Sequence, residues 1–122
     1  ASLEAIAYAV KANLEQIEGL AGVAATDVTV GGGMTRSSTW TRILADVLDR
    51  ELKVVASPQV SGMGAYLSAC TALGEYGSLD EAAQEARTRL LSLEPDPLAS
   101  AEYQDYYAGW LRMASDLQAL EP

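Results

Sequence analysis

The stretch that decides the fold runs from Asp27 to Trp40 and reads DVTVGGGMTRSSTW. A β-branched run ends in three consecutive glycines, and a hydroxyl-rich turn then leads into residues with helical periodicity. The run predicts a short strand, and either Ser37 or Ser38 can cap the following helix. Glycines between a strand and a helix start let a ligand touch the main chain, and the helix offers it free N–H groups. The stretch therefore predicts a platform for an anion or a nucleotide, with a strained turn that binds nothing as the alternative.

Two familiar phosphate-binding fingerprints do not fit Gly31, Gly32 and Gly33. A P-loop requires a lysine after its last glycine, and none follows here. A dinucleotide-binding fingerprint requires a third glycine at another spacing and an acidic residue closing the next strand, and GGGMTRSS offers neither. The glycines taken alone therefore leave the kind of ligand open.

The residues on both sides of this stretch predict an α/β fold. The preceding helix carries apolar residues at helical spacing, namely Leu3, Ile6, Ala7, Val10, Leu14 and Ile17, and Gly19 and Gly22 end it. After the glycines, the second helix buries Trp40, Ile43, Leu44, Val47 and Leu48, and ELKVVAS predicts a second strand. Two strands separated by a helix favour parallel neighbours. Because two strands alone make a poor sheet, we expect the rest of the sheet to lie upstream of this chain.

Three further helices are expected after the second strand. The first has an apolar side formed by Val60, Met63, Leu67 and Cys70, with small residues around it that indicate a close approach to its backbone. The second begins with the capping box SLDE at residues 78–81 and continues to about Leu90, and LEPDP forms a turn after it. The last starts near Ser100, and its stripe of Tyr103, Tyr107, Trp110, Ala114 and Leu117 is interpreted as core.

The composition limits the function. The chain has 122 residues, enough for one domain, and its net charge of −9 argues against binding nucleic acid or anionic lipid. No apolar run is long enough to span a bilayer, and no basic region followed by an apolar stretch marks a secretory signal. The absence of histidine excludes Ser-His-Asp and Cys-His nucleophiles and histidine-ligated metal sites within the chain. A lone Cys70 cannot form an internal disulfide and suits a reducing cytoplasm.

The segment GGGMTRSSTWTRILADVLDRELKVV resembles the C-terminal domain of the FGGY carbohydrate kinases. These sugar and polyol kinases typically show a strand, two glycines, a Ser or Asn, an aromatic residue, and Ala-Asp-Val before a short strand. The matching residues here are Gly32-Gly33, Ser37, Trp40 and Ala45-Asp46-Val47. The segments on both sides continue the likeness in order and spacing over nearly the whole chain.

The resemblance implies part of an actin-like, ribonuclease-H-like ATPase domain. Residues 1–122 would be a partial C-terminal, nucleotide-binding domain, with the sugar-binding domain upstream. The reaction implied is transfer of the γ-phosphoryl group of ATP to a sugar or polyol hydroxyl, with Mg²⁺ bridging the phosphates. A ketose such as a pentulose is our mild preference as substrate. The family's catalytic aspartate precedes this segment, so we assign no catalytic residue here and expect the chain alone to be inactive.

The resemblance also implies roles for individual residues. Gly31, Gly32 and Gly33 would lie against the adenosine and the α-phosphate, and Ser37 would hydrogen-bond nearby. The helix that contains Gly62 and Gly64 would back this loop. Asp46 lies close to the buried stripe of its helix, where a carboxylate is unfavourable unless it accepts specific hydrogen bonds, so it would be an internal polar anchor. A metal ligand is the alternative for Asp46.

Two departures and two rival functions stay open. Gln59 stands where the family commonly has a glutamate, and Tyr66 where it has an alanine, and both bear on nucleotide affinity. A non-enzymatic module that forms a homodimer through its strand edge and tyrosine-rich last helix is the second function. Another actin-like ATPase, of the acetate-kinase or chaperone type, is the third.

Overall fold

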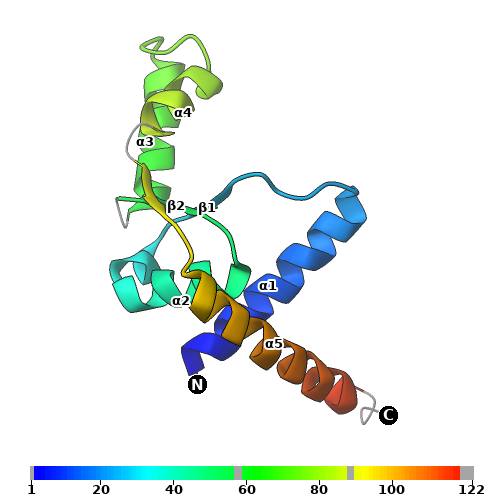
Figure 1. Ribbon diagram of the computed structural model, residues 1–122. Coiled ribbons are helices and arrows are strands. Elements are labelled where there is room, and N and C mark those ends of the chain that lie inside the picture. The colour runs from blue at the N-terminus through cyan, green and yellow to red at the C-terminus, as the bar shows by residue number, and fades with distance from the viewer. Residues whose placement is uncertain (1, 57–58, 88–89, 119–122) are drawn as a thin grey trace.

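A computed structural model describes residues 2–56, 59–87 and 90–118 of the protein. The elements follow one another as α1 (Ser2–Ala21), β1 (Val28–Val30), the 3₁₀ helix η1 (Gly33–Arg36), α2 (Ser38–Leu48), β2 (Leu52–Val55), α3 (Val60–Ala72), α4 (Leu79–Arg87), β3 (Leu90–Leu93) and α5 (Pro97–Gln118). Figure 1 shows the small sheet at the centre, with α1, α2 and α5 on one side and α3 and α4 on the other.

The sheet confirms one prediction and corrects another. β1 and β2 are parallel, with Val28 opposite Leu52, as the strand–helix–strand pattern predicted. The sequence analysis missed β3, because it extended the preceding helix to about Leu90 and followed it with a turn. β3 instead pairs antiparallel with β2, with Leu93 opposite Leu52. Four residues are too short for their period to distinguish a strand from a helix end, so the pairing with β2 decides the structure.

The core lies on one face of the sheet. Leu52 and Val54 of β2 are buried on this face, while Lys53 and Val55 on the other face are half-buried. The alternation follows from the two-residue period of a strand. The other buried apolar residues of this cluster come from three helices, namely Ala7, Tyr8, Trp40, Leu44, Ala45, Val47, Leu48 and Tyr107. The predicted stripe of α2 is thereby confirmed, with Ile43 partly buried beside it.

The buried face of α1 differs from the prediction. Ala7, Tyr8 and Lys11 are buried, whereas Ile6 and Ile17 expose 45% and 62% of their surface. The Tyr8 ring packs against rings of α5, with its centroid 5.9 Å from that of Tyr107. Aromatic pairs bury large areas, so contacts with a helix at the other end of the chain set the rotation of α1.

The aromatic stripe of α5 is core over most of its length. Tyr107 is buried, Tyr103, Trp110 and Ala114 are half-buried, and Leu117 is exposed, so the prediction was wrong only at the last position. α5 also begins at Pro97, three residues before the predicted start. The Asp96 side chain accepts from the N–H of Leu98 at 2.9 Å, so an aspartate followed by a proline begins this helix.

A buried lysine and a buried tyrosine join α1 to α5. Lys11 Nζ donates to Val47 O at 3.1 Å and to Gln104 Oε1, and lies 4.9 Å from the centre of the Tyr107 ring. The Tyr107 hydroxyl donates to Glu15 Oε2 at 2.7 Å. Burial and then this hydrogen bond raise the pKa of Tyr107, and burial lowers the pKa of Lys11.

Replacing Tyr107 by phenylalanine is expected to change how stability depends on pH. The variant loses a hydrogen bond to a carboxylate, so its free energy of unfolding near neutral pH falls by about 1–2 kcal/mol. In the parent chain, the raised pKa of Tyr107 means that the unfolded state loses this proton first, so stability falls above about pH 10. The variant lacks this titrating group, so the free energies of unfolding of the two proteins, measured by urea titration, should converge above about pH 10. A constant difference from pH 8 to 11 contradicts this assignment.

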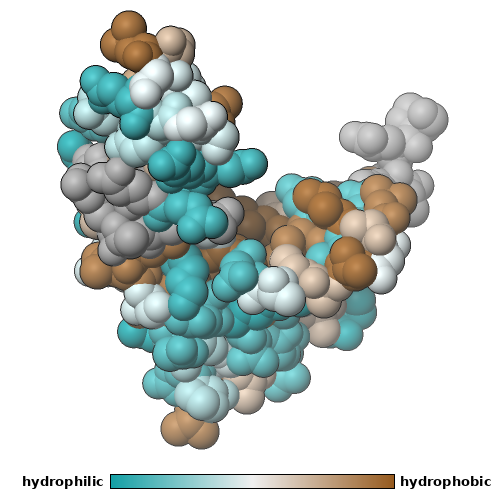
Figure 2. Space-filling view, turned by 90° about the horizontal axis from the view of Figure 1, so that it is seen from above, coloured by the Kyte–Doolittle hydropathy of each residue, from teal (hydrophilic) through white to brown (hydrophobic). Residues whose placement is uncertain are grey.

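α3 and α4 form a separate arm of the molecule. Cys70 is buried, as predicted, and the capping box begins α4, since Ser78 Oγ accepts from the Glu81 N–H at 3.1 Å. Figure 2 shows a deep notch between two arms, with apolar residues on its floor and along the arm at the right of the view. Among the described helices, none combines the length and the apolar character that a membrane crossing requires.

Candidate functional site

The glycine run forms a tight connection between β1 and α2. β1 ends at Val30, Gly32 precedes the single 3₁₀ turn of η1, and Ser37 precedes α2. Within η1, both the N–H and the Oγ1 of Thr35 donate to Gly32 O, at 3.2 and 2.8 Å. Ser37 Oγ accepts from the Trp40 N–H at 3.2 Å, so Ser37 rather than Ser38 is the cap. The 3₁₀ turn was not predicted, although the residues are those that the sequence placed in the turn.

Gly31 is required by packing inside the chain. A Cβ atom at this position would lie 2.7 Å from Val60 Cγ2 and 3.3 Å from Val55 Cγ2. The absence of a side chain thus lets the end of β1 approach β2 and the first residue of α3. Val60 is the first residue of α3, so the helix that contains Gly62 and Gly64 lies against the start of this loop, as predicted.

Gly32 is required by its backbone conformation. Its φ of 105° and ψ of −171° fall in a region that residues with a Cβ rarely adopt. No atom of the described residues lies within 4 Å of a Cβ placed there. The requirement at Gly32 is therefore conformational and not steric.

Gly33 has neither requirement. Its φ lies outside the left-handed region, and no described atom comes within 4 Å of the position of a Cβ. Gly62 and Gly64 in α3 share both properties, although a glycine inside a helix costs about 1 kcal/mol relative to alanine. Packing among the described residues therefore accounts for Gly31, and conformation for Gly32, but nothing in this part of the chain accounts for Gly33.

The loop is open and locally positive in an acidic chain. Gly31, Gly33 and Ser37 are exposed, and Gly32 is half-buried. From residue 28 to residue 45 the sequence has no carboxylate but two arginines, Arg36 and Arg42. The first internal bond of η1 is made by the Thr35 N–H, so the N–H groups of residues 33 and 34 precede it, as at any helix start. The loop thus offers main-chain donors within a stretch of sequence that carries no carboxylate.

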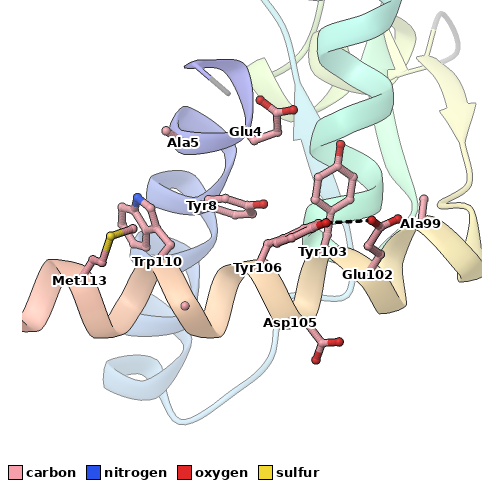
Figure 3. Close-up of a pocket in the computed structure, with 11 residues that line it drawn as sticks. Glu4, Ala5, Tyr8, Ala99, Glu102, Tyr103, Asp105, Tyr106, Trp110 and Met113 are labelled. Carbon is pink, nitrogen blue, oxygen red and sulfur yellow. Dashed lines mark hydrogen bonds between the residues drawn. The ribbon is translucent and has the colours of Figure 1, made fainter.

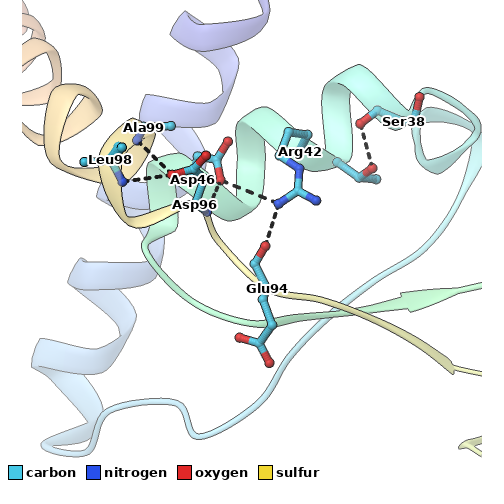
Figure 4. A network of polar contacts seen from close by, with 8 residues as sticks. Ser38, Arg42, Asp46, Glu94, Asp96, Leu98 and Ala99 are labelled. Atoms are coloured by element: carbon cyan, nitrogen blue, oxygen red, sulfur yellow. Dashed lines mark hydrogen bonds and ion pairs between the residues drawn. The ribbon is translucent and has the colours of Figure 1, made fainter.

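A network around Asp46 fixes the helix that carries the loop (Figure 4). Asp46 is 4% exposed, and its Oδ1 accepts from the Asp96 N–H at 2.8 Å. Arg42 lies 3.9 Å from the same oxygen and donates to Glu94 O at 2.6 Å. The carboxylate therefore ties α2 to the connection between β3 and α5. The predicted role as an internal polar anchor is confirmed.

A second polar contact fixes the segment that leads into β1. Arg50 donates to both carboxylate oxygens of Glu18, at 2.5 and 3.1 Å, and Glu18 Oε1 also accepts from the Ala25 N–H at 2.6 Å. The hydrogen bond from Arg50, then that from Ala25, lowers the pKa of Glu18. The end of α1, the residues before β1 and the connection between α2 and β2 are thereby held together.

An apolar hollow of about 340 Å³ lies beside the loop. Its lining includes Val55 and Val60, the two residues that a Cβ at residue 31 would meet, together with Met63, Gly64 and Leu67 of α3. Among the described residues, no three carboxylates or thiols come together in a way that could hold a metal ion. This region therefore combines main-chain donors with an adjoining apolar surface and has no metal-binding cluster of its own.

Comparison with known proteins decides the family. Residues 1–73, more than half of the chain and including the whole glycine loop, match the FGGY family of carbohydrate kinases, C-terminal domain. The chain belongs to the FGGY family. Its relatives include autoinducer-2 kinases of Salmonella paratyphi B, 30% identical over 108 residues, and of Yersinia pestis, 32% identical over 95 residues. These alignments cover 88% and 78% of this chain but only 20% and 17% of the kinases.

Solved structures agree with the FGGY assignment over nearly the whole chain. A xylulose kinase from Rhodospirillum rubrum superposes with a TM-score of 0.74 at 25% identity, covering 96% of this chain and 24% of that one. A Plasmodium falciparum glycerol kinase, solved with ADP, gives a TM-score of 0.73 at 19% identity, covering 98% and 23%. The chain thus folds as part of an actin-like ATPase domain, as the sequence analysis predicted, and it spans about a sixth to a quarter of the length of these relatives.

Proposed function

We propose that this FGGY chain supplies the adenine-nucleotide loop of an ATP-dependent carbohydrate kinase, with residues Gly31, Gly32, Gly33 and Ser37 against the nucleotide. The observation that carries the proposal is Gly33, whose missing side chain faces open space without a packing or conformational reason among the described residues. A bound nucleotide supplies that reason, because a phosphate or ribose can then approach the main chain. The kinase relatives favour ATP over other anions.

The chemistry of the loop suits phosphate groups. Phosphoryl transfer depends on positioning and on stabilisation of charge rather than on covalent participation by the protein. The N–H groups at the start of η1 and the positive charge of Arg36 at its end meet that need. The Ser37 hydroxyl, which accepts from Trp40, retains its own proton for donation to an oxygen of the ligand.

The remaining parts of the reaction belong outside residues 1–122. We place the sugar site, the catalytic aspartate and the coordination of Mg²⁺ in the portion of the longer kinases that this chain does not cover. The described residues do not fit a protein-only metal site, since no acidic cluster forms among them. The exposed Ile6, Val10 and Ile17 on α1 offer an apolar surface against which such a portion can pack. A reducing cytoplasm suits both the free Cys70 and the use of ATP.

Thermal unfolding with and without MgATP tests the proposal. At an MgATP concentration about ten times the dissociation constant, the midpoint of thermal unfolding of the chain should rise by about 5 °C. Gly33→Val should remove this rise, because its side chain occupies the space at the loop, while its own midpoint without nucleotide changes little. Gly19→Val is the matched control, since its Cβ also meets open space but on α1. No rise in the parent chain, or an equal rise in Gly33→Val, refutes the nucleotide loop.

A further inference from the structure

A groove of about 870 Å³ runs between α1 and α5, on elements that the nucleotide loop does not use. Figure 3 shows Tyr8 pointing from α1 towards α5, where Trp110, Tyr106 and Tyr103 lie in a row. The centroid of the Tyr8 ring lies 6.4 Å from that of Tyr103 and 6.1 Å from that of Trp110. Tyr8 is 7% exposed and forms the floor, whereas Tyr106 is 58% exposed. The groove therefore has an aromatic floor and an accessible aromatic wall.

Three carboxylates line the same groove. Glu4 comes from α1, and Glu102 and Asp105 come from α5, although the Asp105 side chain points to the side of α5 away from Tyr8 (Figure 3). Glu102 Oε1 accepts from the Tyr106 hydroxyl at 3.0 Å, which places a negative charge beside that exposed ring. No lysine or arginine is among the lining residues. The charge of Glu102 and the negative faces of the rings both favour a cation.

The shape of the groove favours a chain over a compact ion. Its lining residues on α5 extend from Ala99 to Met113. Fourteen residues of helix correspond to about 21 Å, the length of roughly six residues of extended chain. Apolar side chains such as Met113 lie along it together with the carboxylates. An occupant that alternates cationic and apolar groups over this length therefore fits better than a single small cation.

We propose that the groove between α1 and α5 docks an extended polypeptide segment that carries arginine or lysine side chains. A cationic side chain stacks on the Tyr106 ring and pairs with Glu102, while apolar side chains contact Trp110 and Met113. The chain already contains one such contact in its interior, with Lys11 Nζ 4.9 Å from the centre of the Tyr107 ring. A second copy of the chain or an uncharged apolar segment is the competing occupant.

Fluorescence anisotropy with a labelled hexapeptide of alternating arginine and leucine tests the proposal on the full chain. The matched probe replaces each arginine by citrulline, which keeps the shape and removes the charge. We expect the arginine peptide to bind at least tenfold more tightly, and its affinity to fall as salt is raised. Tyr106→Leu and Glu102→Gln should each weaken binding by about three- to tenfold. Asp116→Asn, a change of equal charge on α5 outside the groove, should leave the affinity unchanged.

Three results overturn the proposal. If the citrulline peptide binds equally well, the groove is an apolar docking surface. If neither peptide binds, the groove does not dock a cationic segment. A dimer seen in sedimentation that dissociates in Tyr106→Leu, and that excludes the peptide, identifies a second copy as the occupant. Each variant changes an exposed side chain, so the comparison does not depend on altering the core.

Discussion

Replacing Asp46 by alanine is expected to lower the free energy of unfolding by about 2–3 kcal/mol, equivalent to a fall of about 10 °C in the midpoint. The substitution removes the acceptor of the Asp96 N–H, which is bonded to Asp46 Oδ1 at 2.8 Å. It also leaves the guanidinium of Arg42 without the carboxylate at 3.9 Å. Because Asp46 is buried and its charged carboxylate accepts this hydrogen bond, the effect exceeds that of a surface ion pair.

Asp46→Asn is the control that separates hydrogen bonding from charge. The amide oxygen still accepts from the Asp96 N–H, so we expect this variant to lose about 1 kcal/mol and to refold normally. Denaturant titrations of the two variants measure the difference. Equal losses for alanine and asparagine mean that the charge matters and the hydrogen bond does not. A midpoint of thermal unfolding for Asp46→Ala within about 1 °C of that of the parent chain contradicts the role of Asp46 as an internal anchor.

The three glycines of the loop are expected to respond differently to alanine. Gly31→Ala should cost about 1–3 kcal/mol, because the new Cβ lies 2.7 Å from Val60 Cγ2 and a side chain must move. Gly32→Ala should cost about 1–3 kcal/mol for a different reason, the backbone strain at a φ of 105°. Gly33→Ala should change stability by less than about 0.5 kcal/mol, because neither reason applies.

A second substitution distinguishes the two costs. Shortening Val60 to alanine in the Gly31→Ala background should restore part of the lost stability, because it removes the methyl group that the new Cβ meets. The same change should not rescue Gly32→Ala. If Gly33→Ala is as destabilising as Gly31→Ala, the space at residue 33 is filled in solution, and the main support for a ligand at this loop is lost.

The loop could be predicted from the sequence because its signals are local. The glycines, the β-branched residues before them and the serine cap lie within fourteen residues, and each acts on its own backbone. The sequence also found Asp46, since a carboxylate close to an apolar stripe requires partners. It could not separate the roles of Gly31, Gly32 and Gly33, because Val60, which gives Gly31 its role, lies in another helix.

The parts that sequence reasoning missed depend on distant contacts. β3 forms because residues 90–93 pair with β2, about forty residues earlier. The rotation of α1 follows from the packing of Tyr8 on α5, about a hundred residues later, and this brings Lys11 into the core while exposing Ile6. Local periodicity cannot determine which of two apolar faces a distant helix will cover. The aromatic groove between α1 and α5 escaped detection for the same reason.

The most direct test of the nucleotide loop follows the backbone amides of the ¹⁵N-labelled chain by NMR during a titration with MgADP. The account predicts that the amide signals of Gly31, Gly32 and Gly33 shift together and saturate, while those of Gly22, Gly74 and Gly109 stay in place. Saturating shifts confined to other elements, such as the groove between α1 and α5, or no shifts at concentrations well above those of a cell, would contradict it.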